Sequence, residues 1–209
     1  MKVKPRDHDI TDRVGGVRVG RLFSNLVSPP VMFALLALAL AWAELPFWTG
    51  LAWAAVFGFF ISLLPILFIA YLLHTGRVGE LHMSNTQERR LPYLVTMCGS
   101  FLVLGLLVIF DGPPLLRCLA LLNIFTLVSL MLVNSHWLIS FHATGAASSV
   151  MVIGLVFGIV TALYFLPLLF LVILVRLYLR RHTVAQVVGG TLLGVLSVSV
   201  LSFLGCFIA

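Results

Sequence analysis

Apolar residues recur along the chain in seven long runs separated by short polar segments. The runs cover about residues 27–43, 51–73, 93–110, 115–135, 143–160, 162–179 and 184–207. Most of them are long enough to cross about 30 Å of hydrocarbon as an α-helix. A helix satisfies its own backbone hydrogen bonds inside lipid, and the sequence lacks the strand-like alternation of a barrel. The pattern therefore predicts an all-α, polytopic integral membrane bundle of about six to seven transmembrane helices.

The polar segments predict how this bundle is organised. Residues 1–26 form a basic N-terminal tail, and residues 27–209 form a single transmembrane helical domain. Within that domain, polar connections are expected at 74–92, 134–144 and 176–183. If seven helices alternate across the bilayer, the tail and these three connections share one side of the membrane. We call this side the loop end.

Proline and glycine positions predict local features of the helices. Pro65 and Pro167 lie inside apolar runs and are expected to kink their helices. The pairs Gly154/Gly158 and Gly190/Gly194 each have the four-residue spacing that lets two helices approach closely. Close packing between helices is therefore expected near both pairs.

Composition excludes a water-soluble domain and a disordered chain. Hydrophobic residues make up 61% of the sequence and charged residues only 10%, whereas about a quarter of a soluble domain is charged. The three cysteines, Cys98, Cys118 and Cys206, fall in or beside apolar runs without a metal-ligand spacing. They are expected to be packing residues.

The charged residues predict an orientation. Of the 13 lysines and arginines, all but Arg117 belong to the loop end. The positive-inside rule then places the loop end in the cytoplasm, as a multi-pass protein of the cell inner membrane. The lipid bilayer is the expected partner, because the basic excess also attracts anionic headgroups. A nucleic-acid partner is not expected, since no large basic surface stands clear of the bilayer, and the oligomeric state stays open.

Polar side chains at the loop end gather in three short strings. They are H-M-S-N-T-Q-E-R-R-L-P at 82–92, I-S-F-H at 139–142 and R-L-Y-L-R-R-H-T-V-A-Q at 176–186. The strings hold arginines, histidines and serine but almost no carboxylates, which suits an anion. Phosphate fits best, because arginine offers it a planar fork of donors and helix N-termini add backbone N–H groups.

In order and in spacing, the three strings resemble the motifs of the type 2 phosphatidic acid phosphatase superfamily of integral-membrane lipid phosphatases. That family has K-x6-R-P, P-S-G-H and S-R-x5-H-x3-D motifs with transmembrane helices between them. The resemblance covers about residues 75–195. It implies a phosphatase-type core, a membrane lipid substrate with a phosphate headgroup, and no metal or other cofactor.

The resemblance also implies a role for each matching residue. His182 would be the nucleophile that forms a phosphohistidine, and His142 the general acid; Gln186 stands where the family has the aspartate that orients the nucleophile. An imidazole near pH 7 is suited to either the nucleophilic or the acid role. The implied phosphate-binding residues are Arg176, Arg90 or Arg89, Ser140 and His82.

The sequence departs from the family pattern at several positions. Gln186 brings no charge, although its amide oxygen is expected to accept the ring N–H of His182 one helical turn away. The first-motif lysine is replaced by Met83 when counted from Arg90, or by His82 when counted from Arg89. These departures can slow the reaction or change its outcome.

The leading hypothesis is a membrane-embedded, metal-independent lipid phosphatase that hydrolyses a lipid phosphomonoester or a prenyl phosphate or diphosphate. Two alternatives stay open on the same scaffold. One is a non-catalytic lipid-phosphate binder or transporter, favoured by Gln186 and the missing lysine. The other is a phosphotransferase that uses an alcohol as acceptor in place of water.

Overall fold

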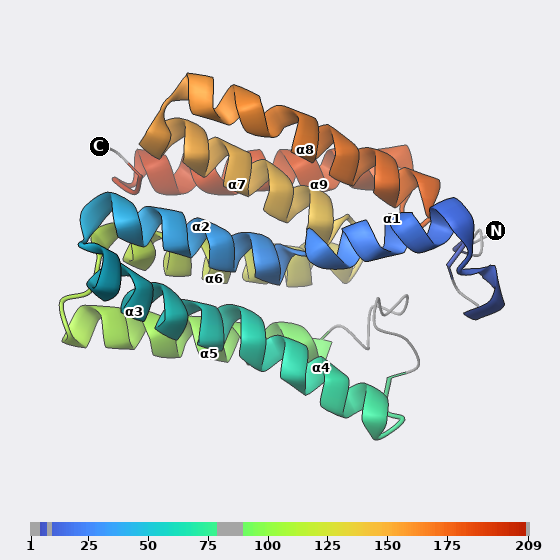
Figure 1. Cartoon of the computed structure of the whole chain (residues 1–209), viewed down its shortest axis with the longest axis horizontal. Helices are drawn as coiled ribbons and strands as arrows, with labels where there is room; N and C mark the ends of the chain where they lie inside the picture. The colour runs from blue at the N-terminus through green and yellow to red at the C-terminus, as the bar shows by residue number, and fades with distance from the viewer. Residues whose placement is uncertain (1–4, 8–9, 79–89, 208–209) are drawn as a thin grey trace.

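The computed structural model is a bundle of apolar helices that run in alternating directions (Figure 1). It describes residues 5–7, 10–78 and 90–207. The helices are η1 (Ile10–Asp12), α1 (Gly15–Leu26), α2 (Pro29–Glu44), α3 (Phe47–Gly58), the π-helical η2 (Phe59–Leu63), α4 (Leu64–His74), α5 (Arg90–Ile109), α6 (Pro114–Asn134), α7 (Phe141–Phe157), α8 (Ile159–Tyr178) and α9 (Val184–Phe203). The described residues include no strand, so the predicted all-α class is confirmed.

Several of these helices are long and apolar enough to cross a membrane. Five qualify, namely the continuous stretch Phe47–His74 together with α5, α6, α8 and α9. The pair α1–α2, with 44° between its halves, counts as a sixth if the two halves form one bent span. Helix α7 has 17 residues, which at 1.5 Å per residue is about 25 Å and shorter than the hydrocarbon layer. The predicted integral membrane bundle is confirmed, with five to six long spans and one shorter apolar helix.

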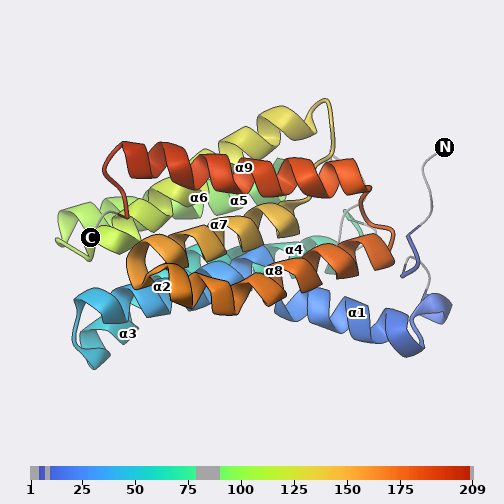
Figure 2. The same ribbon diagram turned by 90° about the horizontal axis from the view of Figure 1, so that it is seen from above.

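The described parts of the predicted loop end lie together. Figure 1 shows α1, the end of α4, the start of α5, the α6–α7 connection and the α8–α9 turn at one end of the bundle, and the C-terminus at the other. Figure 2 shows the same division from above. The boundary between the fifth and sixth runs lies at Gly158, whose φ of 89° lets the chain reverse between α7 and α8. That turn comes slightly before the expected position at 160–162.

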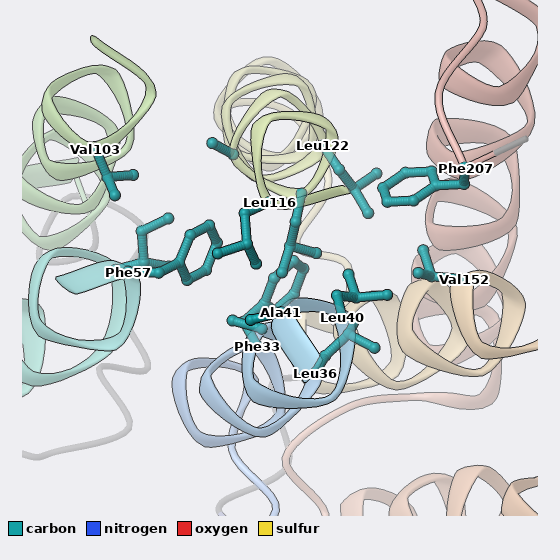
Figure 3. Packing of buried hydrophobic residues seen from close by; sticks show 14 of the residues in the cluster. Phe33, Leu36, Leu40, Ala41, Phe57, Val103, Leu116, Leu122, Val152 and Phe207 are labelled. Atoms are coloured by element: carbon teal, nitrogen blue, oxygen red, sulfur yellow. The ribbon is translucent and has the colours of Figure 1, made fainter. Parts of the chain in front are cut away.

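Helix α2 forms the centre of the main core. Its residues Phe33, Leu36 and Leu40 point among side chains from several neighbouring helices, including Phe57 of α3 and Leu116 of α6 (Figure 3). These side chains are buried, whereas many large apolar residues elsewhere face outward, as expected of a surface in contact with lipid. Interior packing in this setting rests on close van der Waals contact between helices.

A close helix contact joins α7 and α9. Gly190 and Gly194 of α9 face the backbone of α7, so that a Cβ at Gly190 would lie 2.5 Å from the Ser140 carbonyl oxygen. A Cβ at Gly194 would lie 2.4 Å from the carbonyl oxygen of Thr144. The predicted close packing at this glycine pair is therefore confirmed. Gly158 of the other pair instead forms the turn between α7 and α8.

The proline at position 65 coincides with a change of helix type. The π-helical η2 immediately precedes α4, and Pro65 is the second residue of α4. Proline has no N–H to donate and disrupts the regular hydrogen-bond ladder, which accounts for the irregularity predicted here. Figure 1 shows α4 diverging from α1 and α2 toward the loop end. Pro167 lies within α8, which continues through it.

The basic tail contains a helix that the hydropathy pattern did not predict. Helix α1 has small residues, Gly16 and Gly20, on the face that meets Tyr178 and Leu179 near the end of α8. On another face, Val19, Leu22 and Leu26 are exposed, at the three- and four-residue spacing of a helix stripe. Such a helix suits a membrane–water interface.

Candidate functional site

A cavity of about 300 Å³ opens at the loop end between the α1–α2 bend, α4, α5, the start of α7, the end of α8 and the α8–α9 turn. Its polar wall holds His142, Arg176 and His182. Its remaining lining is mostly apolar or weakly polar and consists of Ser24, Asn25, Ser28, Pro29, Pro30, Val31, Pro65, Ile66, Ile69, Pro92, Tyr93, Thr96 and Phe141. The cavity therefore combines a cationic end with an apolar wall.

Arg176 supplies the permanent positive charge of the cavity. It lies in the last turn of α8, where a cation interacts favourably with the helix dipole, and only 2% of its surface is exposed. Its Nη1 donates a hydrogen bond to the Ser24 hydroxyl oxygen at 2.9 Å. A buried arginine at membrane depth is costly, so such a residue is a candidate for function.

His142 lies in the first turn of α7 and faces the last turn of α1. Its Nε2 is 3.1 Å from the Ser24 carbonyl oxygen and 3.4 Å from the Ser24 hydroxyl oxygen. A carbonyl oxygen only accepts, so the shorter contact assigns the hydrogen to Nε2. Helix α1 ends at Leu26, so the Ser24 carbonyl is one of the last carbonyls of the helix, which have no intrahelical partner and are open to another donor.

His182 reaches the cavity from the turn that joins α8 to α9. Arg180 adopts a left-handed conformation with φ of 53°, and the Arg181 N–H donates to the Arg176 carbonyl at 3.1 Å, which reverses the chain. The next residue, His182, is 7% exposed and lines the cavity. Arg176 and His182, which are six positions apart in the third string, thus line the same cavity.

The contact between α7 and α9 also links the two histidines. The backbone N–H of Ser140, two residues before His142, donates to the Gln186 carbonyl, four residues after His182, at 3.0 Å. Together with the close approach at Gly190, this bond joins the starts of both helices. The relative position of the histidines is therefore coupled to the packing of this pair of helices.

Gln186 does not have the contact expected from the family comparison. Its side-chain oxygen accepts the backbone N–H of Thr183 at 2.9 Å, while the Thr183 hydroxyl accepts the backbone N–H of Gln186 at 3.3 Å. The two residues form a capping box at the start of α9. The expectation that the amide oxygen receives the His182 ring N–H is corrected accordingly, because the helix N-terminus provides a closer donor.

The other predicted site residues do not line the cavity. Ser140 is buried, and its hydroxyl caps α7 by accepting the Ala143 N–H at 3.3 Å. Arg90 is exposed at the first residue of α5 and is not part of the cavity wall. His82 and Arg89 lie outside the residues that the structure describes.

The structure adds Ser24 and Asp7, two residues of the tail that sequence reasoning missed. Ser24 is 3% exposed and contacts both Arg176 and His142. Gly16, Gly20 and Ser24 repeat at four-residue spacing beside an apolar stripe. This spacing is the signal that would have indicated a packed helix in the tail.

Asp7 fastens the tail to the turn before His182. Its carboxylate is fully buried, accepts a hydrogen bond from Arg181 Nε at 2.7 Å and lies 3.6 Å from Arg21 Nη1. Its backbone carbonyl also accepts from Arg13 and Arg21, at 3.1 and 3.2 Å. A buried carboxylate needs such partners, since burying an unpaired charge is costly. The tail is thus a built part of the loop end.

Comparison with family models, curated proteins and solved structures finds no match to this chain. Among the described residues, no group of three or more His, Cys, Asp or Glu side chains is placed to hold a metal ion.

Proposed function

We propose that this protein is an integral-membrane lipid phosphatase that works through a phosphohistidine intermediate. The single observation that carries the proposal is the convergence of His142, Arg176 and His182 on one cavity. These residues come from two separate strings and were selected from the sequence for complementary roles in phosphate chemistry. The family resemblance and this convergence are independent arguments for the same site.

The proposed reaction has two steps. In the first, a ring nitrogen of His182 attacks phosphorus, the bond to the lipid oxygen breaks, and His142 gives that oxygen a proton. In the second, water attacks phosphorus and passes a proton to His142, while the bond between phosphorus and the His182 nitrogen breaks, so that inorganic phosphate leaves and both histidines return to their starting state. Arg176 balances the charge on the phosphate oxygens in both steps, which requires it to be fixed before the substrate arrives.

The apolar wall of the cavity supports a lipid substrate. Pro29, Pro30 and Val31 line one side and Ile66 and Ile69 another. An alkyl or prenyl chain can lie along these groups while its phosphate reaches the cationic end. Both a lipid phosphomonoester and a prenyl phosphate or diphosphate fit this division, and the substrate panel of the experiment below separates them.

The loop end is proposed to face the cytoplasm of the cell inner membrane. The support is the concentration of basic residues at this end and the positive-inside rule. An active site on this face would draw its substrate from the cytoplasmic leaflet.

The test is phosphate release from a panel of lipid phosphates by the full chain in detergent, with a chelator present. We expect release by the wild type, no turnover by His182→Ala and strongly slowed turnover by His142→Ala. His136→Ala is the matched control, since His136 is an exposed loop-end histidine that bonds to Ser135. Labelled phosphate retained on the wild type through an acid-labile, base-stable linkage identifies the intermediate; full activity of His182→Ala would refute the mechanism.

The second candidate is a non-catalytic lipid-phosphate binder or transporter. It is favoured by Gln186, whose side-chain oxygen is bonded to the Thr183 N–H and adds no charge near His182. Saturable binding of a lipid phosphate without phosphate release would favour this candidate. Transfer of the phosphoryl group to an added alcohol, without release of inorganic phosphate, would instead indicate a phosphotransferase.

A further inference from the structure

The hydroxyl of Ser24 contacts both Arg176, which binds phosphate in the proposed function, and His142, which transfers the proton. Its oxygen accepts the hydrogen bond from Arg176 Nη1 at 2.9 Å and is 3.4 Å from His142 Nε2. Ser24 belongs to α1 and lines the cavity. A polar side chain on a third element therefore contacts both functional groups.

The hydrogen-bond geometry indicates where the hydroxyl hydrogen can go. His142 Nε2 is closer to the Ser24 carbonyl oxygen, at 3.1 Å, and must supply the hydrogen of that bond. Nε2 then has no lone pair to accept the hydroxyl hydrogen. Arg176 can only donate, so it does not accept this hydrogen either. The Ser24 O–H is left to serve an acceptor in the cavity.

We propose that Ser24 is a further phosphate-binding residue of this site, which holds Arg176 in place and donates its O–H to a phosphate oxygen of the bound lipid. The inference rests on the proposed function for its lipid substrate. It goes beyond the family resemblance, which covers only residues 75–195 and assigns nothing in the tail. It makes α1 part of the substrate site.

The attachment of α1 supports a fixed position for this hydroxyl. Gly20, one helical turn before Ser24, packs against Leu179 at the end of α8, and a Cβ at Gly20 would lie in van der Waals contact with the Leu179 side chain, at 3.5 Å. Arg21 of α1 also lies 3.6 Å from the buried Asp7 carboxylate, which in turn binds Arg181. A donor on a helix that is attached in two ways costs little conformational entropy when phosphate binds.

The direct test is binding of inorganic phosphate to the full chain in detergent, measured by calorimetry. We expect Ser24→Ala to weaken binding about 10- to 100-fold, the range for a lost hydrogen bond to a charged group. Alanine favours helix, so this change does not weaken α1 itself. Ser24→Thr keeps a hydroxyl and is expected to restore most of the affinity, which a role in packing alone would not produce.

Ser197→Ala is the matched control. Ser197 is another buried helical serine, but its hydroxyl bonds to Leu193 within α9. We expect this variant to bind phosphate as the wild type does. Equal phosphate affinity in Ser24→Ala and wild type would overturn the proposal, and so would a wild type that binds no phosphate at all.

Turnover of the same variants separates this inference from the proposed function. For a lipid substrate that is hydrolysed, Ser24→Ala should raise KM about 10- to 100-fold with a smaller change in kcat, because the contact forms as soon as phosphate binds. Ser24-dependent phosphate binding with no release from any lipid would refute hydrolysis but keep Ser24 as a phosphate ligand. Release that is unaffected by Ser24→Ala would keep hydrolysis and refute the role of Ser24.

Discussion

Replacing Gly190 by alanine tests whether the contact between α7 and α9 controls both stability and the site. The new Cβ would lie 2.5 Å from the Ser140 carbonyl oxygen and 3.2 Å from the Ser140 carbonyl carbon and nitrogen. These are backbone atoms, which no rotamer change can move aside. The two helices must therefore separate by at least about 0.5 Å at this point to relieve the overlap.

The size of the effect follows from two opposing terms. Glycine to alanine inside a helix contributes about 1 kcal/mol of stability, whereas overpacking a tight contact costs about 1–3 kcal/mol. We expect a net loss of up to about 2 kcal/mol for Gly190→Ala, which lowers the unfolding midpoint by up to several °C for a chain of this size. Gly105→Ala is the matched control, because a Cβ at Gly105 of α5 meets nothing within 4 Å. It should be neutral or stabilising.

The assay is thermal unfolding of both variants in the same detergent, followed by phosphate release. Gly190 presses on Ser140, whose N–H is bonded to the Gln186 carbonyl, so a shift here moves His142 relative to His182. Misplacement of reacting groups by about 1 Å can cost about a hundredfold in rate, and a shift of half that size should cost about tenfold. Equal unfolding midpoints for Gly190→Ala and Gly105→Ala would refute the argument from close approach.

Three further outcomes are expected. Gln186→Leu should remove the acceptor for the Thr183 N–H and lower stability by about 0.5–2 kcal/mol, whereas Gln186→Glu keeps the capping box and should stay near wild type. Equal unfolding midpoints for the two variants would contradict the stabilising role of the cap. Asp7→Asn should release the tail, because it removes the buried charge that pairs with Arg181 at a cost of about 3–5 kcal/mol. Trypsin should then cleave within residues 13–21 far faster than in the control Asp12→Asn, which changes an exposed aspartate. Equal cleavage rates in the two variants would show that Asp7 does not hold the tail in place. In a cysteine-free chain, an impermeant thiol reagent added outside intact cells should label a cysteine at Thr49 but not one at Ser135, and the reverse pattern would overturn the proposed orientation.

Much of the architecture was predictable because the bilayer imposes a simple rule on sequence. A span must be apolar over about 20 residues, so the seven runs reveal the long helices and, by alternation, which connections share an end. His142, Arg176 and His182 could be grouped on the same basis, since polar residues near a membrane interface stand out against apolar runs. In the structure all three side chains line one cavity, while their roles stay predictions.

The remaining features depend on short-range competition that a hydropathy pattern does not capture. Helix α1 has 12 residues and mixes exposed apolar with charged positions, so its average composition resembles a polar tail. Ser140 and Gln186 match phosphatase motif positions, yet both side chains satisfy backbone N–H groups at helix starts. The T-V-A-Q string at 183–186 matches part of a phosphatase motif and also matches a capping box. In the structure Gln186 forms the capping box, because the backbone N–H groups at the start of α9 are the nearest donors.

The stretch Phe47–His74 has a consequence for how the protein sits in its bilayer. Its 28 residues extend about 42 Å as a helix, well beyond the roughly 30 Å of a hydrocarbon layer. Such hydrophobic mismatch is relieved by tilting, by bending or by local thickening of the lipid. The π-helical η2 and Pro65 provide the bend, and the divergence of α4 from α2 shown in Figure 1 carries the surplus length sideways. The same irregularity also places Pro65 and Ile66 in the cavity wall. The fit of this span to the thickness of the bilayer and the shape of the cavity therefore depend on the same few residues.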